Sequence, residues 1–308
     1  MKTATRRPEL ALIGFGEAAQ AFVAGWAGAG CAVGLRAYDI KTGMDADTAA
    51  AKRADYARAG VAGSATPQEA VAGADAVLSL VTADAALAAA ESVAAHMPPG
   101  ALFLDGNSCA PTTKRASAAL IEAAGGRYTD MAIMAPVHPR LHKVPVLLSG
   151  PHAEAGAAFL RALDMVPRVE PGPVGRASSI KMIRSVMVKG LEAVMAECLL
   201  AARQAGVEDA VIASLEASYP GLGWEARAAY NLERMMVHGR RRAAEMQEVA
   251  RTVRDLGLPG SMAAATAEWE DLVGSLALEP GADDARARAD RILAALTPPD
   301  DTQTTNRG

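Results

Sequence analysis

The sequence of 308 residues has few aromatic residues, few cysteines and no long apolar run. Phe, Trp and Tyr make up 4% of it, so we expect Ala, Leu, Val and Met to fill most of the core. Its three cysteines, Cys31, Cys109 and Cys198, are too widely spaced for a disulfide framework or a cysteine-based metal site. No apolar stretch reaches the roughly 18 residues of a transmembrane helix. We therefore expect reduced thiols, no metal site and no membrane span.

The sequence also lacks a surplus of positive charge. It has 31 Lys and Arg residues against 35 Asp and Glu residues, a net charge of −4. Nucleic acids and anionic membranes attract basic surfaces, so neither is an expected partner. The first strand pattern begins close to the N-terminus, which leaves no room for a signal peptide. These features predict a cytoplasmic protein.

A glycine turn near the N-terminus is the most informative motif. Residues 10–13 read as a buried strand, and an Ala-rich helix pattern follows from Glu17, with the spacing G-x-G-x-x-A between them. Gly14 permits a tight turn, Gly16 lets a pyrophosphate approach the backbone, and Ala19 allows close packing of helix on strand. The helix N-terminus attracts the phosphates. The predicted dinucleotide contacts are Gly14, Phe15, Gly16, Glu17, Ala18 and Ala19.

An acidic residue follows the second predicted strand, which covers residues 32–38. Asp39 stands where a carboxylate would bind the ribose 2′-hydroxyl of NAD and repel the 2′-phosphate of NADP. Lys41 lies two residues later and would weaken that preference. The alternative is that Asp39 only caps the turn. NAD is therefore the preferred predicted cofactor, with NADP as the second choice.

Strand and helix patterns alternate as far as residue 172. Apolar strands are predicted at 76–81 and 101–105, with others near 61, 127–134, 144–149 and 167–170. Helices are predicted at 45–59, 83–96, 110–124 and 153–163, and Thr66-Pro67-Gln68-Glu69 is a typical helix start. Repeated strand–helix units predict an α/β Rossmann domain over residues 1–172, with a mostly parallel, doubly wound sheet.

Strand signals end at Gly172-Pro173. A helical pattern then runs from residue 177 to 205, followed by predicted helices at 208–218, 223–238, 240–256, 262–276 and 283–296. We therefore expect a long connecting helix and an all-α domain over residues 173–296. The polar segment 297–308 is predicted to be a disordered tail.

This arrangement resembles the β-hydroxyacid dehydrogenases, the relatives of 6-phosphogluconate dehydrogenase, over most of the chain. The C-terminal half looks more like a subgroup with a variant helical domain. Asp105-Gly106-Asn107-Ser108 stands where the family has its segment near the nicotinamide, and Tyr128-Thr129-Asp130 begins the family's substrate-binding strand. Gly175 and Lys181 match the family's Gly-x-x-x-x-x-Lys, whose lysine is catalytic. The resemblance implies a homodimer and adds four cofactor contacts: Val81, Thr82, Asn107 and Ser108.

Lys181 also suits the chemistry. Oxidation of an alcohol needs a base for the hydroxyl proton, and a lysine that is partly desolvated or near another cation can serve. Lys181 lies one turn inside the long predicted helix, beside the predicted domain boundary. The alternative is a solvated surface lysine. Arg184 and Ser185 stand three and four residues later, where the family has an Asn, and are predicted substrate contacts.

The segment from Met131 to Arg140 departs from the family. It lacks the family's Ser-Gly-Gly, and Pro136 removes a backbone donor. The substrate must therefore be held differently, and the alternative is a solvated basic loop. The predicted substrate contacts in this segment are Met134, Ala135, Pro136 and His138.

A second basic group, His238 with Arg240 to Arg242, lies where two helices are predicted to meet. Its plain interpretation is a solvated face. Its sharper interpretation is a site for a substrate anion, with His238 and Arg242 as contacts.

Together these features predict an NAD(P)-dependent oxidoreductase that acts on a small anionic hydroxy acid, either a 3-hydroxy acid or a sugar acid. Lys181 is the predicted general acid and base. Loss of CO2 from a β-keto product stays open. The alternatives are an imine or ketone reductase on the same fold, and a nucleotide-binding protein without catalysis.

Overall fold

The computed structural model describes residues 6–296 and divides the chain into two compact units, one up to Ile183 and one from Arg184 onward. The predicted tail, 297–308, lies outside the described residues. We predicted the domain boundary at residues 172–173, whereas the division falls inside the long helix. The reason is that the first turns of that helix are hydrogen-bonded to the sheet of the first unit, as described below.

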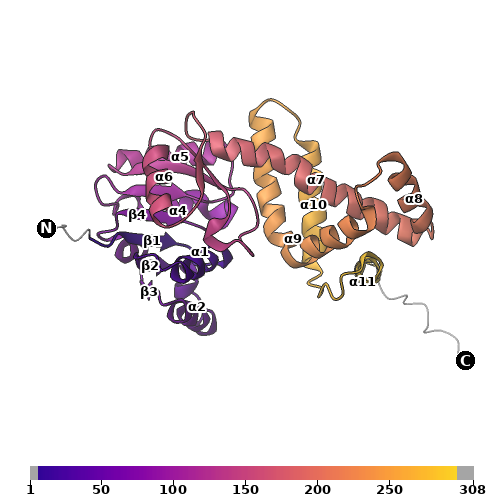
Figure 1. Cartoon of the computed structure of the whole chain (residues 1–308), viewed down its shortest axis with the longest axis horizontal. Helices are drawn as coiled ribbons and strands as arrows, with labels where there is room; N and C mark the ends of the chain where they lie inside the picture. The colour runs from indigo at the N-terminus through magenta and orange to yellow at the C-terminus, as the bar shows by residue number, and fades with distance from the viewer. Residues whose placement is uncertain (1–5, 297–308) are drawn as a thin grey trace, which may run out of the picture. The chain divides into compact units, whose positions relative to one another are not determined.

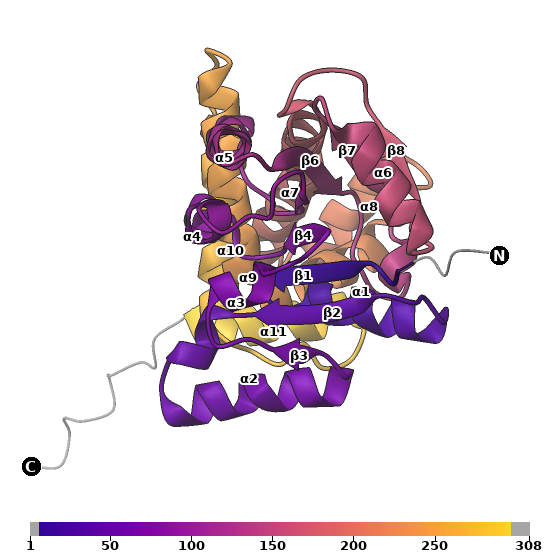
Figure 2. The ribbon, with the colours of Figure 1, turned by 90° about the vertical axis from the view of Figure 1, so that its left-hand side faces the viewer.

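The first unit is built on an eight-stranded sheet with the order β3-β2-β1-β4-β5-β6-β7-β8. Neighbouring strands are parallel except for β6 and β7, which confirms the prediction of a mostly parallel sheet. Figure 2 shows β1 to β4 side by side. The strands are β1 (Glu9–Ile13), β2 (Gly34–Tyr38), β3 (Ala62–Gly63), β4 (Ala76–Ser79), β5 (Leu102–Asp105), β6 (Arg127–Ile133), β7 (Val146–Ser149) and β8 (Pro167–Val169).

Apolar side chains cover both faces of this sheet. Leu10 and Leu12 of β1 belong to one buried cluster, while Ala11 and Ile13 belong to another. Successive side chains of a strand point to opposite faces, so β1 is buried on both sides, as a central parallel strand should be. The helices of this unit are α1 (Glu17–Gly28), α2 (Ala46–Ala59), α3 (Pro67–Val71), α4 (Ala86–Ala94), α5 (Pro111–Ala123) and α6 (Ala153–Ala162). Short 3₁₀ turns are η1 (Ile40–Gly43), η2 (Ala83–Ala85) and η3 (Leu141–Lys143).

The second unit is helical. Helix α7 (Arg176–Gln204) starts in the first unit and continues into the second, which contains α8 (Glu208–Ser218), α9 (Trp224–Asp255), α10 (Ser261–Ser275) and α11 (Ala285–Leu296). The prediction of two helices, 223–238 and 240–256, was wrong, because α9 is continuous through Gly239. Figure 1 shows α9 beside α10. A Cβ on Gly239 would lie 2.8 Å from Gly274 Cα of α10, so the glycine permits close helix packing rather than ending the helix.

The described range, residues 6–296, contains no helix that combines the length and the apolar character that a membrane span requires. Its His, Cys, Asp and Glu side chains form no group of three or more that could hold a metal ion. None of the three cysteines, all of which lie in this range, forms a disulfide bond.

Candidate functional site

The glycine turn lies between β1 and α1, at the carboxyl end of the sheet. Gly14 has φ +87°, and its N–H donates to the carbonyl of Tyr38 at 2.8 Å. A Cβ at this position would lie 2.5 Å from the carbonyl oxygen of Leu80. Both the left-handed backbone and the lack of space therefore require glycine here.

Gly16 serves a different purpose, since it is exposed at the start of α1. No described atom outside its chain neighbours comes within 4 Å of the place where its Cβ would stand. Gly16 is the N-cap of α1, whose first N–H groups lack acceptors within the helix and carry a partial positive charge. Ala19 is fully buried, as its predicted packing role requires. An open, bare backbone at a helix N-terminus fits the pyrophosphate of a dinucleotide.

Asp39 follows β2 and faces the glycine turn. Its Oδ2 accepts the N–H of Phe15 at 2.8 Å, and its Oδ1 accepts the N–H of Lys41 at 3.0 Å. The side chain thus caps η1, as one of the two sequence interpretations proposed. Because a carboxylate offers about four acceptor positions, these two bonds leave capacity for the hydroxyls of a ribose.

Residues of α2 that were not predicted from the sequence pack against the glycine turn. The ring of Phe15 is fully buried, with its centroid 5.0 Å from that of Tyr56 in α2. The ammonium of Lys52, in the same helix, donates to the carbonyl of Phe15 at 2.8 Å and pairs with Asp55 at 2.8 Å. Burial, followed by the charge of Asp39, raises the pKa of Tyr56. Helix α2 therefore holds the central residue of the glycine turn in place.

The loops after β4 and β5 are joined by one buried amide. Asn107 Oδ1 accepts the N–H of Val81 at 2.7 Å, while its Nδ2 donates to Ser79 Oγ at 2.9 Å. Asn107 is 3% exposed, whereas Thr82 is exposed and Val81 is half-buried. Among the predicted cofactor residues, Asn107 thus aligns two loops instead of presenting its amide at the surface.

The structure brings two predicted residues from distant parts of the chain into contact. Lys181 Nζ donates to Ser108 Oγ at 2.6 Å, and both side chains are partly exposed. Ser108 stands after β5 and Lys181 in the second turn of α7, 73 residues later. A lysine and a hydroxyl in direct contact, both accessible, are able to exchange a proton with a bound substrate.

Asp130 of β6 holds the start of α7. Its Oδ2 accepts the N–H of Gly175 at 3.1 Å and both the N–H and the hydroxyl of Ser178 at 3.0 and 3.1 Å. The hydroxyl of Ser149 donates to the same oxygen at 3.0 Å and accepts the N–H of Ala177 at 3.0 Å. Negative charge at a helix N-terminus is favourable. These bonds fix the turn that precedes Lys181.

A buried ammonium lies beside Asp130 and Asp105. Lys114 of α5 is fully buried, and its Nζ lies 2.9 Å from Asp105 Oδ1 and 3.6 Å from Asp130 Oδ1. Burial disfavours its charge, but Asp105, Cys109 and Asp130 outweigh this cost and raise the pKa of Lys114 above its usual value. Sequence reasoning missed Lys114. The available signal was two Asp residues in apolar strand patterns, which require a cation or several donors once buried.

The loop after β6 holds four of the predicted substrate contacts. Met134 and Ala135 are half-buried, and Met134 packs near Ala177 and Ile180 of α7. Pro136 and His138 are exposed. His142, a further histidine of this loop, is buried and lies 3.4 Å from Asp164. Met134 is therefore the member of this group that lies beside the helix of Lys181.

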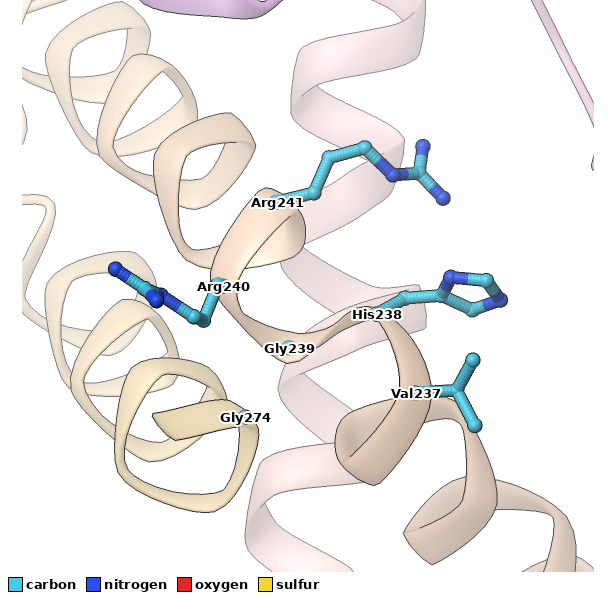
Figure 3. Close-up of a pocket in the computed structure, with 6 residues that line it drawn as sticks. All are labelled: Val237, His238, Gly239, Arg240, Arg241 and Gly274. Atoms are coloured by element: carbon cyan, nitrogen blue, oxygen red, sulfur yellow. The ribbon is translucent and has the colours of Figure 1, made fainter. Parts of the chain in front are cut away.

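The remaining predicted contacts belong to the helical unit. Arg184 and Ser185 lie on α7, and their substrate role stays a prediction. The basic group lies in the middle of α9, not at a helix junction, and lines part of a pocket of about 260 Å³. Figure 3 shows the side chain of Arg240 pointing away from those of His238 and Arg241, which extend to the same side. The three side chains do not converge on one point, which does not favour a single anion site.

Arg242 does not belong to the residues that line that pocket. Its side chain is buried, with Nε 2.9 Å from Glu270 Oε1, and it also pairs with Glu192. Burial raises the pKa of Glu270, although the charge of Arg242 opposes this effect. The guanidinium thus already has two carboxylate partners, so we leave Arg242 out of the candidate substrate site.

Comparison with known families matches two segments of the chain. Residues 9–155 match the NAD binding domain of 6-phosphogluconate dehydrogenase. Residues 202–273 match a domain of unknown function, DUF1932. The first match covers most of the Rossmann unit, and the second covers α8, α9 and most of α10.

Several solved structures match over most of the chain. A conserved hypothetical protein from Sinorhizobium meliloti 1021 is 37% identical, with a TM-score of 0.72 over 94% of this chain and 97% of that one. A conserved protein of unknown function, described as structurally similar to 3-hydroxyacid dehydrogenases, is 27% identical, with a TM-score of 0.66 over 91% and 99%. The 3-hydroxyisobutyrate dehydrogenase of Mycobacterium tuberculosis is 20% identical, with a TM-score of 0.68 over 93% and 99%, and shares the fold.

Proposed function

Because the chain belongs to the family that joins the NAD-binding domain of 6-phosphogluconate dehydrogenase to the DUF1932 domain, we propose that it is an NAD(P)-dependent oxidoreductase for a small hydroxy acid. The contact between Lys181 Nζ and Ser108 Oγ, at 2.6 Å, carries the proposal. It joins a proton-transferring group to the loop after β5. Ligands of open α/β sheets bind outside the carboxyl ends of the strands, at the point where the strand order reverses. In this sheet that point lies between β1 and β4.

The cofactor contacts follow from the loops at this edge. The backbone at Gly16 and the start of α1 would hold the pyrophosphate, and Asp39 would accept the ribose hydroxyls. The charge of Asp39 favours NAD over NADP, and the nearby Lys41 reduces that preference. The loops that contain Val81 and Ser108 would face the nicotinamide, which supplies hydride exchange with the carbinol carbon of the substrate.

Lys181 provides the acid and base for this chemistry. In the direction of reduction its ammonium donates a proton to the carbonyl oxygen, and in oxidation its amine accepts the hydroxyl proton. Ser108 accepts a hydrogen bond from Nζ and so fixes the position of the ammonium. Asp130 fixes the helix start behind it.

The test is a panel of 3-hydroxy acids and sugar acids with NAD⁺ and NADP⁺, followed through the absorbance of the reduced cofactor. General acid–base catalysis typically contributes 10²–10⁴-fold, so Lys181→Ala should lower turnover by about that factor. Ser108→Ala should have a smaller effect. Ser179→Ala is the matched control, since its hydroxyl binds Gly175 O on the same helix turn at 2.7 Å.

The outcomes separate the rival functions. Turnover that survives Lys181→Ala unchanged would remove this residue from the mechanism. Reduction of cyclic imines without turnover of any hydroxy acid would favour the reductase alternative. Tight binding of NADH with no turnover of either class would favour a nucleotide-binding protein.

We also infer a homodimer. Helix α7 exposes Met187, Leu191 and Val194, which recur at helical spacing and are each about half exposed or more. Leu191 and Val188 line a groove of about 600 Å³ with Leu222 and Tyr230. An apolar face of this kind favours a protein partner. Light scattering should give twice the mass of the chain, and Met187→Glu should shift it toward the monomer.

A further inference from the structure

We propose that Lys114 is a positioning residue for the nicotinamide half of the cofactor, although it lies too deep to touch the ligand. The proposal rests on the proposed function. It starts from the fully buried ammonium and the three acceptors around it. Lys114 Nζ donates to Asp105 O at 2.6 Å, to Asp105 Oδ1 at 2.9 Å and to Met131 O at 3.4 Å. One cation from α5 thus joins the end of β5 to β6.

Hydrogen bonds of Asp105 connect Lys114 to the loops after β4 and β5. Asp105 Oδ1 also accepts the N–H of Asn107 at 3.0 Å, and Oδ2 accepts the hydroxyl of Tyr128 at 2.6 Å. Asn107 in turn binds the N–H of Val81. The loops after β4 and β5 therefore take their relative position from a chain of bonds that begins at Lys114.

Asp130 connects Lys114 to α7, the helix that contains Lys181. Its Oδ1 lies 3.6 Å from Lys114 Nζ, and its Oδ2 accepts the donors of Gly175 and Ser178. The ammonium therefore lies between the loop that contains Ser108 and the helix that contains Lys181. These are the two sides of the predicted nicotinamide site.

An apolar residue at position 114 could not neutralise the two carboxylates beside it. Asp105 and Asp130 are both fully buried, and a single lysine stands between them. Removing one partner from a buried ion pair leaves a charge without compensation. The strand ends and the start of α7 would then shift to bring water or other donors to the carboxylates. The glycine turn, after β1, has its own supports in Asp39 and Lys52.

Loss of Lys114 should consequently weaken binding of the nicotinamide half and spare the adenosine half. NADH contacts both halves of the predicted site. ADP-ribose lacks the nicotinamide, so its dissociation constant measures binding at the glycine turn alone. The experiment measures the dissociation constants of both ligands for wild type and Lys114→Met, by NADH fluorescence and by competition with ADP-ribose. We expect NADH to bind about tenfold more weakly to the variant and ADP-ribose to change by less than about twofold.

The matched control is Arg288→Met, which removes another buried cation. Arg288 is 4% exposed in the helical unit and donates to Ala229 O at 2.6 Å. This variant should lose stability without changing the ratio of the two dissociation constants. A purely structural role of Lys114 would make both variants behave alike, and that result would overturn the proposal.

A second variant keeps the test decisive if Lys114→Met does not fold. Lys114→Met with Asp130→Asn restores the net charge of the cluster but not the bonds to Asp105 O and Met131 O. It should fold and still show the weakened binding of NADH relative to ADP-ribose. An unchanged ratio in the folded variant overturns the role of Lys114 alone. A wild-type chain that binds neither NADH nor ADP-ribose overturns the proposed function as well.

Discussion

Each of the two units buries a cation between two carboxylates. In the Rossmann unit Lys114 lies between Asp105 and Asp130, and in the helical unit Arg242 lies between Glu192 and Glu270. All six side chains are nearly or completely inaccessible to solvent. The two clusters have the same balance of charge, so charge alone does not distinguish their roles.

The clusters differ in what the carboxylates bind besides the cation. Asp105 and Asp130 stand in strands and accept backbone N–H groups of a loop and of a helix start, including Asn107 and Ser178. Glu192 and Glu270 stand within α7 and α10, where the helix already satisfies the backbone, and the cation comes from α9. The first cluster therefore fixes loops at the predicted site, while the second joins three helices. The same ionic chemistry serves alignment in one unit and packing in the other.

Removing the cation from the helical cluster should give the largest loss of stability. Arg242→Met leaves Glu192 and Glu270 buried without their partner, and breaking such a pair typically costs about 3–5 kcal/mol. We expect a decrease of this size in the free energy of unfolding, measured by urea denaturation. The affinity for NADH should stay the same, because the cluster lies within the helical unit.

Making the whole helical cluster apolar should restore the stability that Arg242→Met alone loses. A triple variant, Arg242→Met with Glu192→Leu and Glu270→Leu, should be as stable as wild type or more stable by about 1–4 kcal/mol. If the triple variant were less stable than Arg242→Met alone, the cluster would have a role beyond packing. The corresponding replacement of Lys114, Asp105 and Asp130 should abolish NADH binding, since backbone donors would lose their acceptors.

A change in the glycine turn should have a moderate effect that is confined to the Rossmann unit. Gly14→Ala would place a methyl group 2.5 Å from Leu80 O on a backbone with φ +87°. The left-handed conformation costs about 1–2 kcal/mol for a residue other than glycine, and the contact adds to this. Both the unfolding free energy and the affinity for ADP-ribose should fall. Gly30→Ala, at φ +69° with no described atom near its Cβ, is the control and should retain ADP-ribose binding.

The smallest predicted effect is a pH dependence in the helical cluster. Burial raises the pKa of Glu270, so the folded chain holds a proton there at pH values where the unfolded chain has released it. Its contribution is complete below the unfolded pKa of about 4.3 and is lost as the pH rises through the folded pKa. Wild type should therefore gain stability relative to Glu270→Gln as the pH falls from 7 toward that value. Glu268→Gln, an exposed position on the same helix, should show no such trend.

The sequence predicted the fold of the Rossmann unit well, because its signals are local. Gly14, the apolar strands and the cap at Thr66, whose Oγ accepts Glu69 N–H at 3.2 Å, each act through neighbouring residues. The separate roles of Lys181 and Ser108 came from the family resemblance, but their contact was not predicted, since 73 residues separate them. The break predicted near Gly239 was wrong because its partner, Gly274, lies on another helix. Lys114 was missed for the same reason, as its carboxylates come from two strands.

Hydrogen–deuterium exchange with and without NADH would locate the dinucleotide on the chain. If the dinucleotide binds at the carboxyl ends of β1, β4 and β5, exchange slows in residues 14–18, 81–82 and 106–108. Little change is expected around Arg242 and Glu270. Protection that is absent from these three loops at saturating NADH, or that is concentrated in the helical unit instead, would contradict the assignment of the site.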